Sequence, residues 1–279
     1  MSEATPIQVL SLAQLAQWAP GSLARLHVRH DHLFLWITRG QGRIVLHGLR
    51  RGFGAHNAIF VPAGRLLAIE AGRQMIGHAV LIPDDNQVTL PDRCHHLRAQ
   101  DVMVQSELTG LIEEMRRELD ANRPFLSEAM IARAQLLAIW LKRQMRGAED
   151  PARADAGERL VRRFADLVAT DFQTGQSLAD YADRLDITPT HLSRACRKAN
   201  GMTASDMLSQ CLEYEARRRL VATEQPVQDI AQDLGFGSAA YFSRFMQQRC
   251  GLPPSQLRKS SSPHSGVRVG NETRPLPSW

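Results

Sequence analysis

The chain has 279 residues, with 34 lysines and arginines against 29 aspartates and glutamates. This length is enough for one large or two medium domains, each with its own buried core. No apolar run reaches the roughly 18 residues that a membrane-spanning helix needs, so we expect no contact with a membrane. The first ten residues lack the basic start and apolar core of a signal peptide, which favours a cytoplasmic protein.

The four cysteines, Cys94, Cys196, Cys211 and Cys250, lie far apart and include no C-x-x-C pair. This spacing argues against a disulfide framework and against a structural zinc site, and it favours a reducing compartment. We expect no cofactor. The formal net charge of +5 is compatible with an anionic partner but is too small to identify one.

Between about residues 27 and 83 the sequence has the pattern of β structure. Short apolar or β-branched runs alternate with glycines at about the spacing of turns, since glycine supplies the positive φ angles that tight turns need. The runs are Phe34–Ile37, Ile44–Leu46, Ile59–Val61 and Met75–Ile82. This pattern predicts a small all-β barrel or sandwich.

After residue 92 the apolar residues follow helical spacing. One predicted helix carries Leu108 and Leu119 on a single face, and a second is expected over residues 127–145. This helical pair can pack on the β domain or on a second copy of itself, which makes a homodimer plausible. Residues 146–157 are small and charged and are predicted to be a linker, and residues 261–279 are predicted to be a disordered tail.

The segment from residue 158 to residue 260 contains two related halves. The corresponding pairs are Ala182 with Ala231, Leu185 with Leu234, Arg194 with Arg244 and Gly201 with Gly251. The first two pairs are 49 residues apart and the last two are 50 residues apart. The second half therefore has one extra residue, which falls in its turn.

Each half has the pattern of a helix-turn-helix, in which an apolar stripe is followed by a short turn and a capped second helix. Thr188 with Pro189 begins one second helix, and Ser238 begins the other. Polar or small side chains are predicted to face outward from these two helices. They are Thr190, His191, Arg194, Arg197 and Lys198 in the first half, and Ala239, Ala240, Ser243 and Arg244 in the second.

Outward side chains of these types are suited to reading the major groove of double-stranded DNA. Arginine can bridge O6 and N7 of guanine, serine accepts several partners, and alanine can contact a thymine methyl group. Between the two halves, a helix over about residues 204–221 is long enough to hold them apart along the DNA. One monomer can then read two consecutive segments of the groove. A plain helical bundle with solvated polar faces is the alternative interpretation.

At these residues the sequence resembles the DNA-binding domain of the AraC/XylS family of bacterial transcription regulators. The similarity spans about residues 158–259 and is strongest at Ile230-Ala231-x-x-Leu234-Gly235-Phe236, at Tyr241-Phe242-Ser243-Arg244 and at Gly251-Leu252-Pro253-Pro254. The resemblance implies that Thr190, His191 and Arg194 read bases from one helix and that Ala239, Ala240 and Arg244 do so from the other. Cys196, Met246 and Cys250 stand where the family usually has bulky aromatic residues.

The order of the parts also resembles that family, which implies a cupin-like sensor, a helical pair for dimerisation, a linker and a DNA reader. The predicted fold class is therefore α+β with two domains, at residues 1–145 and 158–260. In the sensor, His30 and His32 lie on one face of a strand, as do Phe34 and Trp36, and we expect an effector to contact these four residues. The later histidine of a cupin metal site is missing after Gly64, so no metal site is predicted.

The sequence thus predicts a transcription regulator that binds promoter DNA, is controlled by an unknown small molecule, has RNA polymerase as a possible further partner and is not an enzyme. Two alternatives remain open. One is a cupin-type metalloenzyme with an accessory helical domain, and the other is a DNA-binding protein that responds to no effector.

Overall fold

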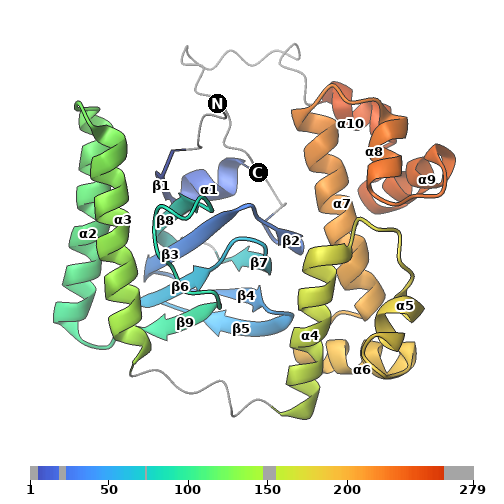
Figure 1. Ribbon diagram of the computed structural model, residues 1–279, viewed down its shortest axis with the longest axis horizontal. Helices are drawn as coiled ribbons and strands as arrows, with labels where there is room; N and C mark the ends of the chain where they lie inside the picture. The colour runs from blue at the N-terminus through green and yellow to red at the C-terminus, as the bar shows by residue number, and fades with distance from the viewer. Residues whose placement is uncertain (1–5, 19–22, 73, 147–154, 261–279) are drawn as a thin grey trace.

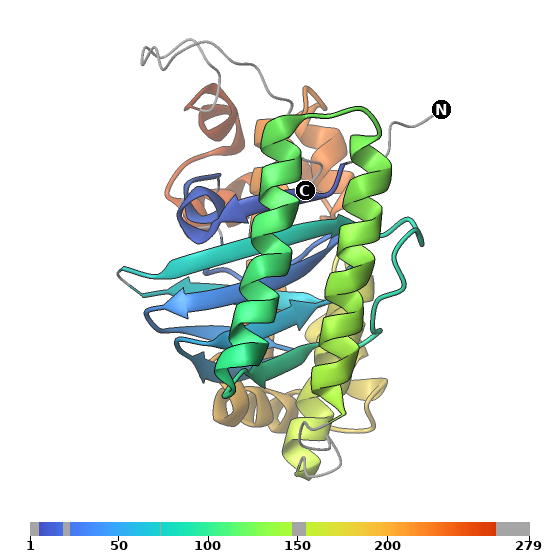
Figure 2. The same cartoon turned by 90° about the vertical axis from the view of Figure 1, so that its left-hand side faces the viewer.

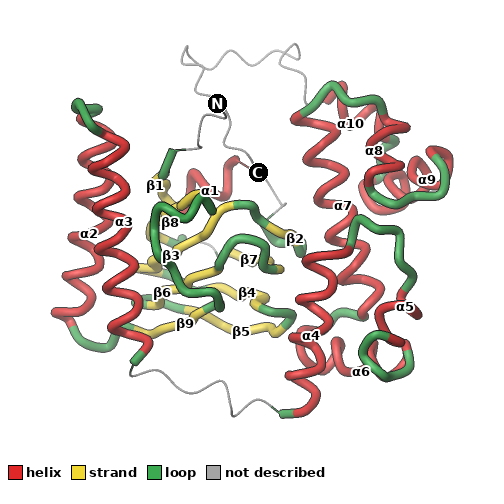
Figure 3. The backbone as a smooth tube through the Cα atoms, viewed as in Figure 1, coloured by secondary structure: helices red, strands yellow, loops and turns green. Residues whose placement is uncertain are grey.

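The computed structural model describes residues 6–18, 23–72, 74–146 and 155–260. A sheet domain precedes residue 147 and a helical domain follows residue 154 (Figure 1). The strands form a middle layer, with two long helices on one side and the helical domain on the other (Figure 3). The predicted two-domain order, with the sheets first and the helices after them, is confirmed.

The sheet domain contains two antiparallel sheets. The five-stranded sheet has the order β1-β8-β3-β6-β9, and the four-stranded sheet has the order β2-β7-β4-β5. The strands are β1 (Gln8–Ser11), β2 (His27–Val28), β3 (Asp31–Arg39), β4 (Gly42–Leu46), β5 (Leu49–Phe53), β6 (Asn57–Val61), β7 (Leu66–Ala71), β8 (Ile76–Pro83) and β9 (His95–Arg98). The short helix α1 (Leu12–Trp18) follows β1 and contacts β8.

The two sheets face each other across an apolar core. Leu35 and Ile59 of the five-stranded sheet and Ile44 and Ile69 of the four-stranded sheet are buried in this core. A closed barrel requires an unbroken ladder of hydrogen-bonded strands around its circumference. Among the described residues the two sheets share no ladder, because β1, β9, β2 and β5 remain edge strands. The prediction of a barrel is therefore corrected to an open pair of facing sheets.

The helices α2 (Val102–Ala121) and α3 (Leu126–Met145) lie side by side across the outer face of the five-stranded sheet (Figure 2). The side chain of Asp101 caps α2 by accepting a hydrogen bond from the Met103 backbone, and α2 ends at Asn122 in the left-handed conformation. Leu108 and Met115 follow helical spacing and are buried against the sheet and α3. These two helices match the helical pair predicted from the sequence.

The helical domain consists of seven helices among the described residues. They are α4 (Ala156–Asp171), α5 (Leu178–Asp183), α6 (Pro189–Asn200), α7 (Ala204–Ala222), α8 (Val227–Asp233), α9 (Ala239–Cys250) and α10 (Pro254–Ser260). Most of the linker predicted at residues 146–157 lies outside the described residues, and α4 already begins at Ala156. The predicted tail at residues 261–279 also lies outside them.

One apolar cluster joins the two domains. Val45, Leu49 and Leu66, on the outer face of the four-stranded sheet, pack in the same cluster as Val161 and Phe164 of α4. Leu192 and Cys196 of α6 belong to this cluster as well, and neither has any exposed surface. The sheet domain and the first part of the helical domain therefore share a single core.

Polar contacts surround this shared core. Arg65 forms an ion pair with Asp166 of α4 at 2.7 Å. The backbone N–H of Leu26 donates a hydrogen bond to Gln210 of α7 at 3.0 Å. The amide of Asn200, at the end of α6, donates a hydrogen bond to the Gly48 carbonyl oxygen at 2.7 Å. These contacts set the orientation in which the two domains dock.

His27 is a buried titratable group at the domain interface. Its ring stacks on Tyr214 of α7 with a centroid distance of 4.3 Å. Its Nδ1 lies 2.8 Å from the carbonyl oxygen of Arg25, a contact that a neutral ring makes by donating from Nδ1. Burial lowers the pKa of His27 from 6.5 to about 3.

This lowered pKa predicts a loss of stability in acid. Below pH 6.5 the unfolded chain binds a proton at His27 that the folded chain does not bind until about pH 3. The free energy of unfolding therefore falls as the pH is lowered between these values, by up to about 1.4 kcal/mol per pH unit from this group. His27→Phe keeps the ring stack and removes the titration, so its stability should fall less steeply with acid.

Urea unfolding of the wild type, of His27→Phe and of His30→Gln at several pH values between 7 and 4.5 measures this difference. His30 is exposed, so His30→Gln is the control and should keep the slope of the wild type. A slope for His27→Phe as steep as that of the wild type would contradict the prediction.

Candidate nucleic-acid interface

The first helix pair, α5 and α6, is built from two local caps. Ser177 and Asp180 form a capping box at the start of α5, and the hydrogen bonds from Ser177 lower the pKa of Asp180. Thr188 caps α6 by accepting a hydrogen bond from the backbone of His191 at 3.2 Å, and Pro189 occupies the first helical position. The sequence predicted this cap correctly.

Packing then decides which side of α6 faces solvent. Tyr181 of α5 lies edge-on to Phe164 of α4 with a centroid distance of 5.8 Å, and Leu192 and Cys196 of α6 are fully buried beside them. The residues on the opposite side of α6 are exposed. They are Thr190, His191, Arg194, Arg197 and Lys198, as the sequence predicted.

The second helix pair, α8 and α9, repeats this arrangement with different side chains. The turn contains Gly235 at φ +74°, and the backbone N–H of Phe236 donates to the Ala231 carbonyl oxygen at 2.9 Å. Ser238 caps α9 by accepting a hydrogen bond from the backbone of Tyr241 at 3.2 Å. The Phe236 ring packs edge-on against Phe242, which is fully buried, at a centroid distance of 5.0 Å.

The outward face of α9 differs in detail from the prediction. Ala240 and Arg244 are exposed, whereas Ala239 and Ser243 are half-buried. Tyr241 is 56% exposed and was absent from the predicted set of DNA-contacting residues. The offset of 50 residues that relates Arg194 to Arg244 also relates His191 to Tyr241, so the repeat itself contained the signal.

Charges in the helical domain separate by sign. Many carboxylates are engaged within the domain: Asp180 and Asp206 complete capping boxes, and Asp233 pairs with Arg219 at 3.0 Å. Within the described ranges, Arg194 and Arg244 form no ion pair. The outward faces of α6 and α9 are therefore electropositive although the whole chain carries only +5.

The helix α7 joins the two pairs. Its 19 residues span about 28 Å at about 1.5 Å per residue. Thr203 and Asp206 form a capping box at its start. Glu213, near its middle, is only 3% exposed and contacts both Arg25 of the sheet domain, at 2.7 Å, and Arg249 of α9, at 3.4 Å. Arg249 thus points towards a buried carboxylate and away from the outward face.

A close backbone contact holds the two helix pairs together directly. A Cβ atom on Gly235, in the turn of the second pair, would lie 2.2 Å from the backbone nitrogen of Gly175, just before the first pair. Arg219 of α7 supports this contact by donating to Gln173 at 2.6 Å and pairing with Asp233. The two pairs therefore have a fixed spacing.

The four residues predicted to contact an effector are not brought together. His30 is exposed, and His32 Nδ1 accepts a hydrogen bond from the backbone of Ala63 at 3.1 Å while its Nε2 lies 3.2 Å from Asp84. Phe34 and Trp36 are each 1% exposed and pack under α2 and α3. Neither pair of residues lines a described cavity, and no cluster of three potential metal ligands occurs in the part of the chain that the structure describes.

The sheet domain has a cavity that the sequence did not predict. It has a volume of about 880 Å³ and lies at one end of the two sheets. Phe53, His56, Asn57, Glu70 and Arg98 are among its lining residues. Asn57 also lies 2.6 Å from Nε2 of His96, whose pKa is lowered by burial. These residues come from four different strands and one turn and share no local sequence pattern.

Comparisons with known proteins concern mainly the helical domain. Residues 181–260 match a family described as a helix-turn-helix domain. The chain is 28% identical over 102 residues to the bifunctional transcriptional activator and DNA repair enzyme AdaA of Bacillus subtilis, covering 37% of this chain and 47% of that protein. It is 28% identical over 142 residues to the transcriptional activator RhaR of Klebsiella pneumoniae, covering 51% of this chain and 49% of that protein.

The chain thus spans about half the length of these curated relatives. Among solved structures, ToxT of Vibrio cholerae is similar over 92% of this chain and 99% of its own, with 11% identity and a TM-score of 0.41. The resemblance to AraC/XylS-type transcription regulators, stated above from the sequence, is confirmed over the helical domain. No described helix is long and apolar enough to cross a membrane.

The contact between Gly175 and Gly235 yields a prediction about stability. Gly235→Ala places a side chain against the Gly175 backbone and forces alanine into a left-handed conformation. We expect the free energy of unfolding, measured by urea unfolding, to fall by about 1–3 kcal/mol.

Gly237→Ala is the matched control in the same turn. A Cβ atom there meets no atom within 4 Å, and the residue does not have a positive φ. We expect its stability to change by less than about 0.5 kcal/mol. Equal stability of the two variants would contradict the close contact.

Proposed function

We propose that this chain is a sequence-specific DNA-binding transcription regulator and not an enzyme. In this proposal, residues 158–260 bind promoter DNA and residues 1–145 form a cupin-like sensor and dimerisation domain. The observation that carries the proposal is the pair of capped helices, α6 and α9, each of which buries one face and exposes a polar, electropositive one.

The two outward faces have the chemistry that major-groove recognition needs. The guanidinium group of Arg194 or Arg244 can bind O6 and N7 of one guanine through two hydrogen bonds. Ala240 can contact a thymine methyl group, and Tyr241 adds an exposed ring with a hydroxyl group. Arg197 and Lys198, towards the end of α6, are suited to phosphate contacts.

The spacing of the two helix pairs supports binding by one monomer to consecutive groove segments. Successive segments on one face of DNA are about 34 Å apart, and α7 spans about 28 Å between the pairs. The contact between Gly175 and Gly235 keeps this spacing fixed. No symmetry in the DNA site is then required within one monomer.

A second copy and a small molecule complete the proposal. Leu136 and Ile139 of α3 are 49% and 37% exposed and lie three residues apart, on one face of the helix, which favours α3 as a homodimer surface. A small-molecule effector is expected in the sheet domain, where the cavity of about 880 Å³ is large enough to hold one. RNA polymerase is a further expected partner.

The alternatives make different predictions. A metalloenzyme would contain bound iron, manganese or zinc, and metal analysis of the purified protein tests this. A DNA-binding protein without an effector would bind DNA with the same affinity across a screen of metabolites. No observation on the described residues favours either alternative.

The proposal predicts the effect of two substitutions. Arg194→Ala and Arg244→Ala should each weaken binding to the specific site by about 1–3 kcal/mol and relax the preference at one base pair. A mobility-shift titration on a site selected from genomic fragments measures both effects.

Arg117→Ala is the control, because Arg117 is an exposed arginine of α2 on the opposite side of the sheets from α6 and α9 (Figure 1). It changes the net charge by the same amount and should leave the affinity for the specific site unchanged. Wild-type affinity in both reading-face variants would overturn the assignment of α6 and α9.

A further inference from the structure

A second cavity lies between the two domains, outside the core of the facing sheets. It has a volume of about 420 Å³. It is lined by Arg43, Arg50, Arg51 and Gly52 of the four-stranded sheet and by Lys198, Ala199, Asn200 and Gly201 at the end of α6. We refer to it as the arginine cleft. Four of its eight lining residues are cationic and none is acidic.

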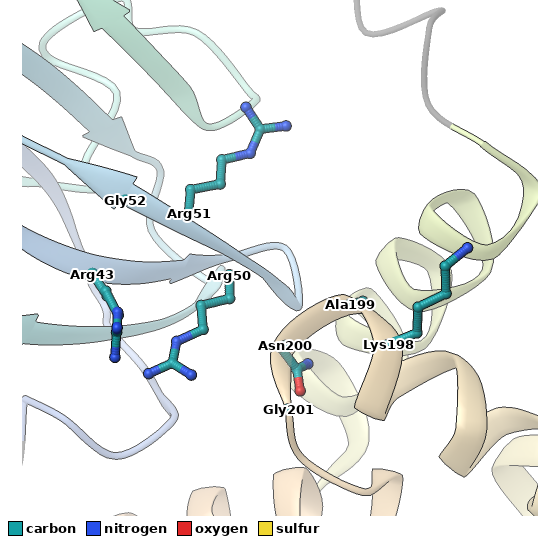
Figure 4. A pocket seen from close by; sticks show the side chains of 8 residues that line it. All are labelled: Arg43, Arg50, Arg51, Gly52, Lys198, Ala199, Asn200 and Gly201. Atoms are coloured by element: carbon teal, nitrogen blue, oxygen red, sulfur yellow. The ribbon is translucent and has the colours of Figure 1, made fainter.

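The strand register turns two of the arginines towards the same side. Arg43 is paired with Gly52 and Glu70 across the sheet. Arg50 is paired with Val45, which is two residues along β4 from Arg43 and therefore lies on the same face. The side chains of Arg43 and Arg50 extend to the same side of the sheet, beside the end of α6, whereas that of Arg51 extends to the other side and that of Lys198 points away from the sheet (Figure 4). Gly52 leaves the sheet surface between them open, because a Cβ atom there would meet nothing within 4 Å.

Glu70 partly neutralises the two arginines, because it lies across the sheet from Arg43 and pairs with Arg50. Arg50 pairs with Glu70 at 2.8 Å, and both side chains are well exposed. In the part of the chain that the structure describes, the side chain of Arg43 forms no hydrogen bond or ion pair. Lys198 pairs with Asp155 at 3.4 Å, also in solvent. An ion pair as exposed as that of Arg50 and Glu70 contributes little free energy, so an anion that contacts Arg43 and Arg50 can compete with Glu70 for Arg50.

The helical domain closes one wall of the cleft. Asn200 is buried, donates to the Gly48 carbonyl oxygen and accepts a hydrogen bond from the Met202 backbone at 2.8 Å. This fixes Gly201, where a Cβ atom would lie 3.8 Å from Nη1 of Arg50. An occupant of the cleft would therefore contact both domains at the end of a predicted DNA-reading helix.

We propose that the arginine cleft binds a small organic dianion, a phosphate monoester or a dicarboxylate, held by Arg43 and Arg50 against the end of α6. The planar guanidinium group of arginine matches the oxygen atoms of carboxylate and phosphate groups through two parallel hydrogen bonds. The cavity volume suits a small molecule.

This proposal rests on the proposed function and adds a second ligand site to it, since a ligand that contacts both domains would favour their docked arrangement and thereby act on α6. Binding itself is measured without DNA. Failure of the cleft proposal is therefore distinct from failure of the DNA-binding proposal.

Isothermal titration calorimetry on the full chain provides the test, with inorganic phosphate, glycerol 3-phosphate and succinate as probes at constant ionic strength. We expect saturable binding of at least one probe by the wild type, and the three arms distinguish a phosphate ester from a dicarboxylate. Arg43→Gln and Arg50→Gln should each weaken binding by roughly tenfold or more. Arg117→Gln, which removes an exposed arginine of α2, should bind as the wild type does.

Arg50→Gln also removes the ion pair with Glu70 and could weaken binding by changing the structure. A third variant therefore tests the cleft with this ion pair intact. Gly52→Asp adds a carboxylate to an open position of the cleft and should abolish binding while the circular dichroism spectrum and the unfolding temperature remain those of the wild type. Absence of saturable binding of all three probes, or equal binding by the wild type, Arg43→Gln and Gly52→Asp, would overturn the proposal.

Discussion

The apolar contact between the four-stranded sheet and the helices α4 and α6 fixes the helical domain against the sheet domain. A sheet that buries one face in the core between two sheets still has a second face to cover. Here Val45, Leu49 and Leu66 lie on that second face, and Val161 and Phe164 of α4 cover them. Because Leu192 of α6 is buried in the same cluster, the helix that presents Arg194 is positioned by the sheet domain as much as by its own helix pair.

The second helix pair depends on the sheet domain in a different way. Its core, around Phe242 and Met246, is a separate cluster that shares α7 with the rest of the domain. The sheet domain reaches it through Glu213, a buried carboxylate that contacts Arg25 on one side and Arg249 of α9 on the other. Arg217 of α7 lies 4.0 Å from the same carboxylate, so three arginines share one buried charge. Buried charges are screened less by solvent than exposed ones, so this contact couples the domains more strongly than exposed pairs do. The first pair is thus held by packing and the second by charge.

The sequence predicted the local structure well, such as helices and their caps, but it predicted poorly how distant segments pack against one another. The caps at Thr188 and Ser238 were found because a cap depends on residues three positions apart. Alternation placed Phe34 and Trp36 on one strand face, but it could not tell that α2 and α3, much further along the chain, cover that face. The open edges of the two sheets and the arginine cleft depend on residues from separate segments, and no local pattern indicates how such segments dock.

The glycine contact between the two helix pairs has a consequence for the DNA rather than for the protein. Gly175 and Gly235 touch through their backbones, so the angle between α6 and α9 cannot adjust by a change of side-chain rotamer. One base pair inserted between the two groove segments rotates the second by about 35° about the DNA axis. Twisting the duplex back costs elastic energy that depends on its sequence. In the proposed complex, the length and the stiffness of the DNA between the contacted bases therefore become part of what the protein recognises.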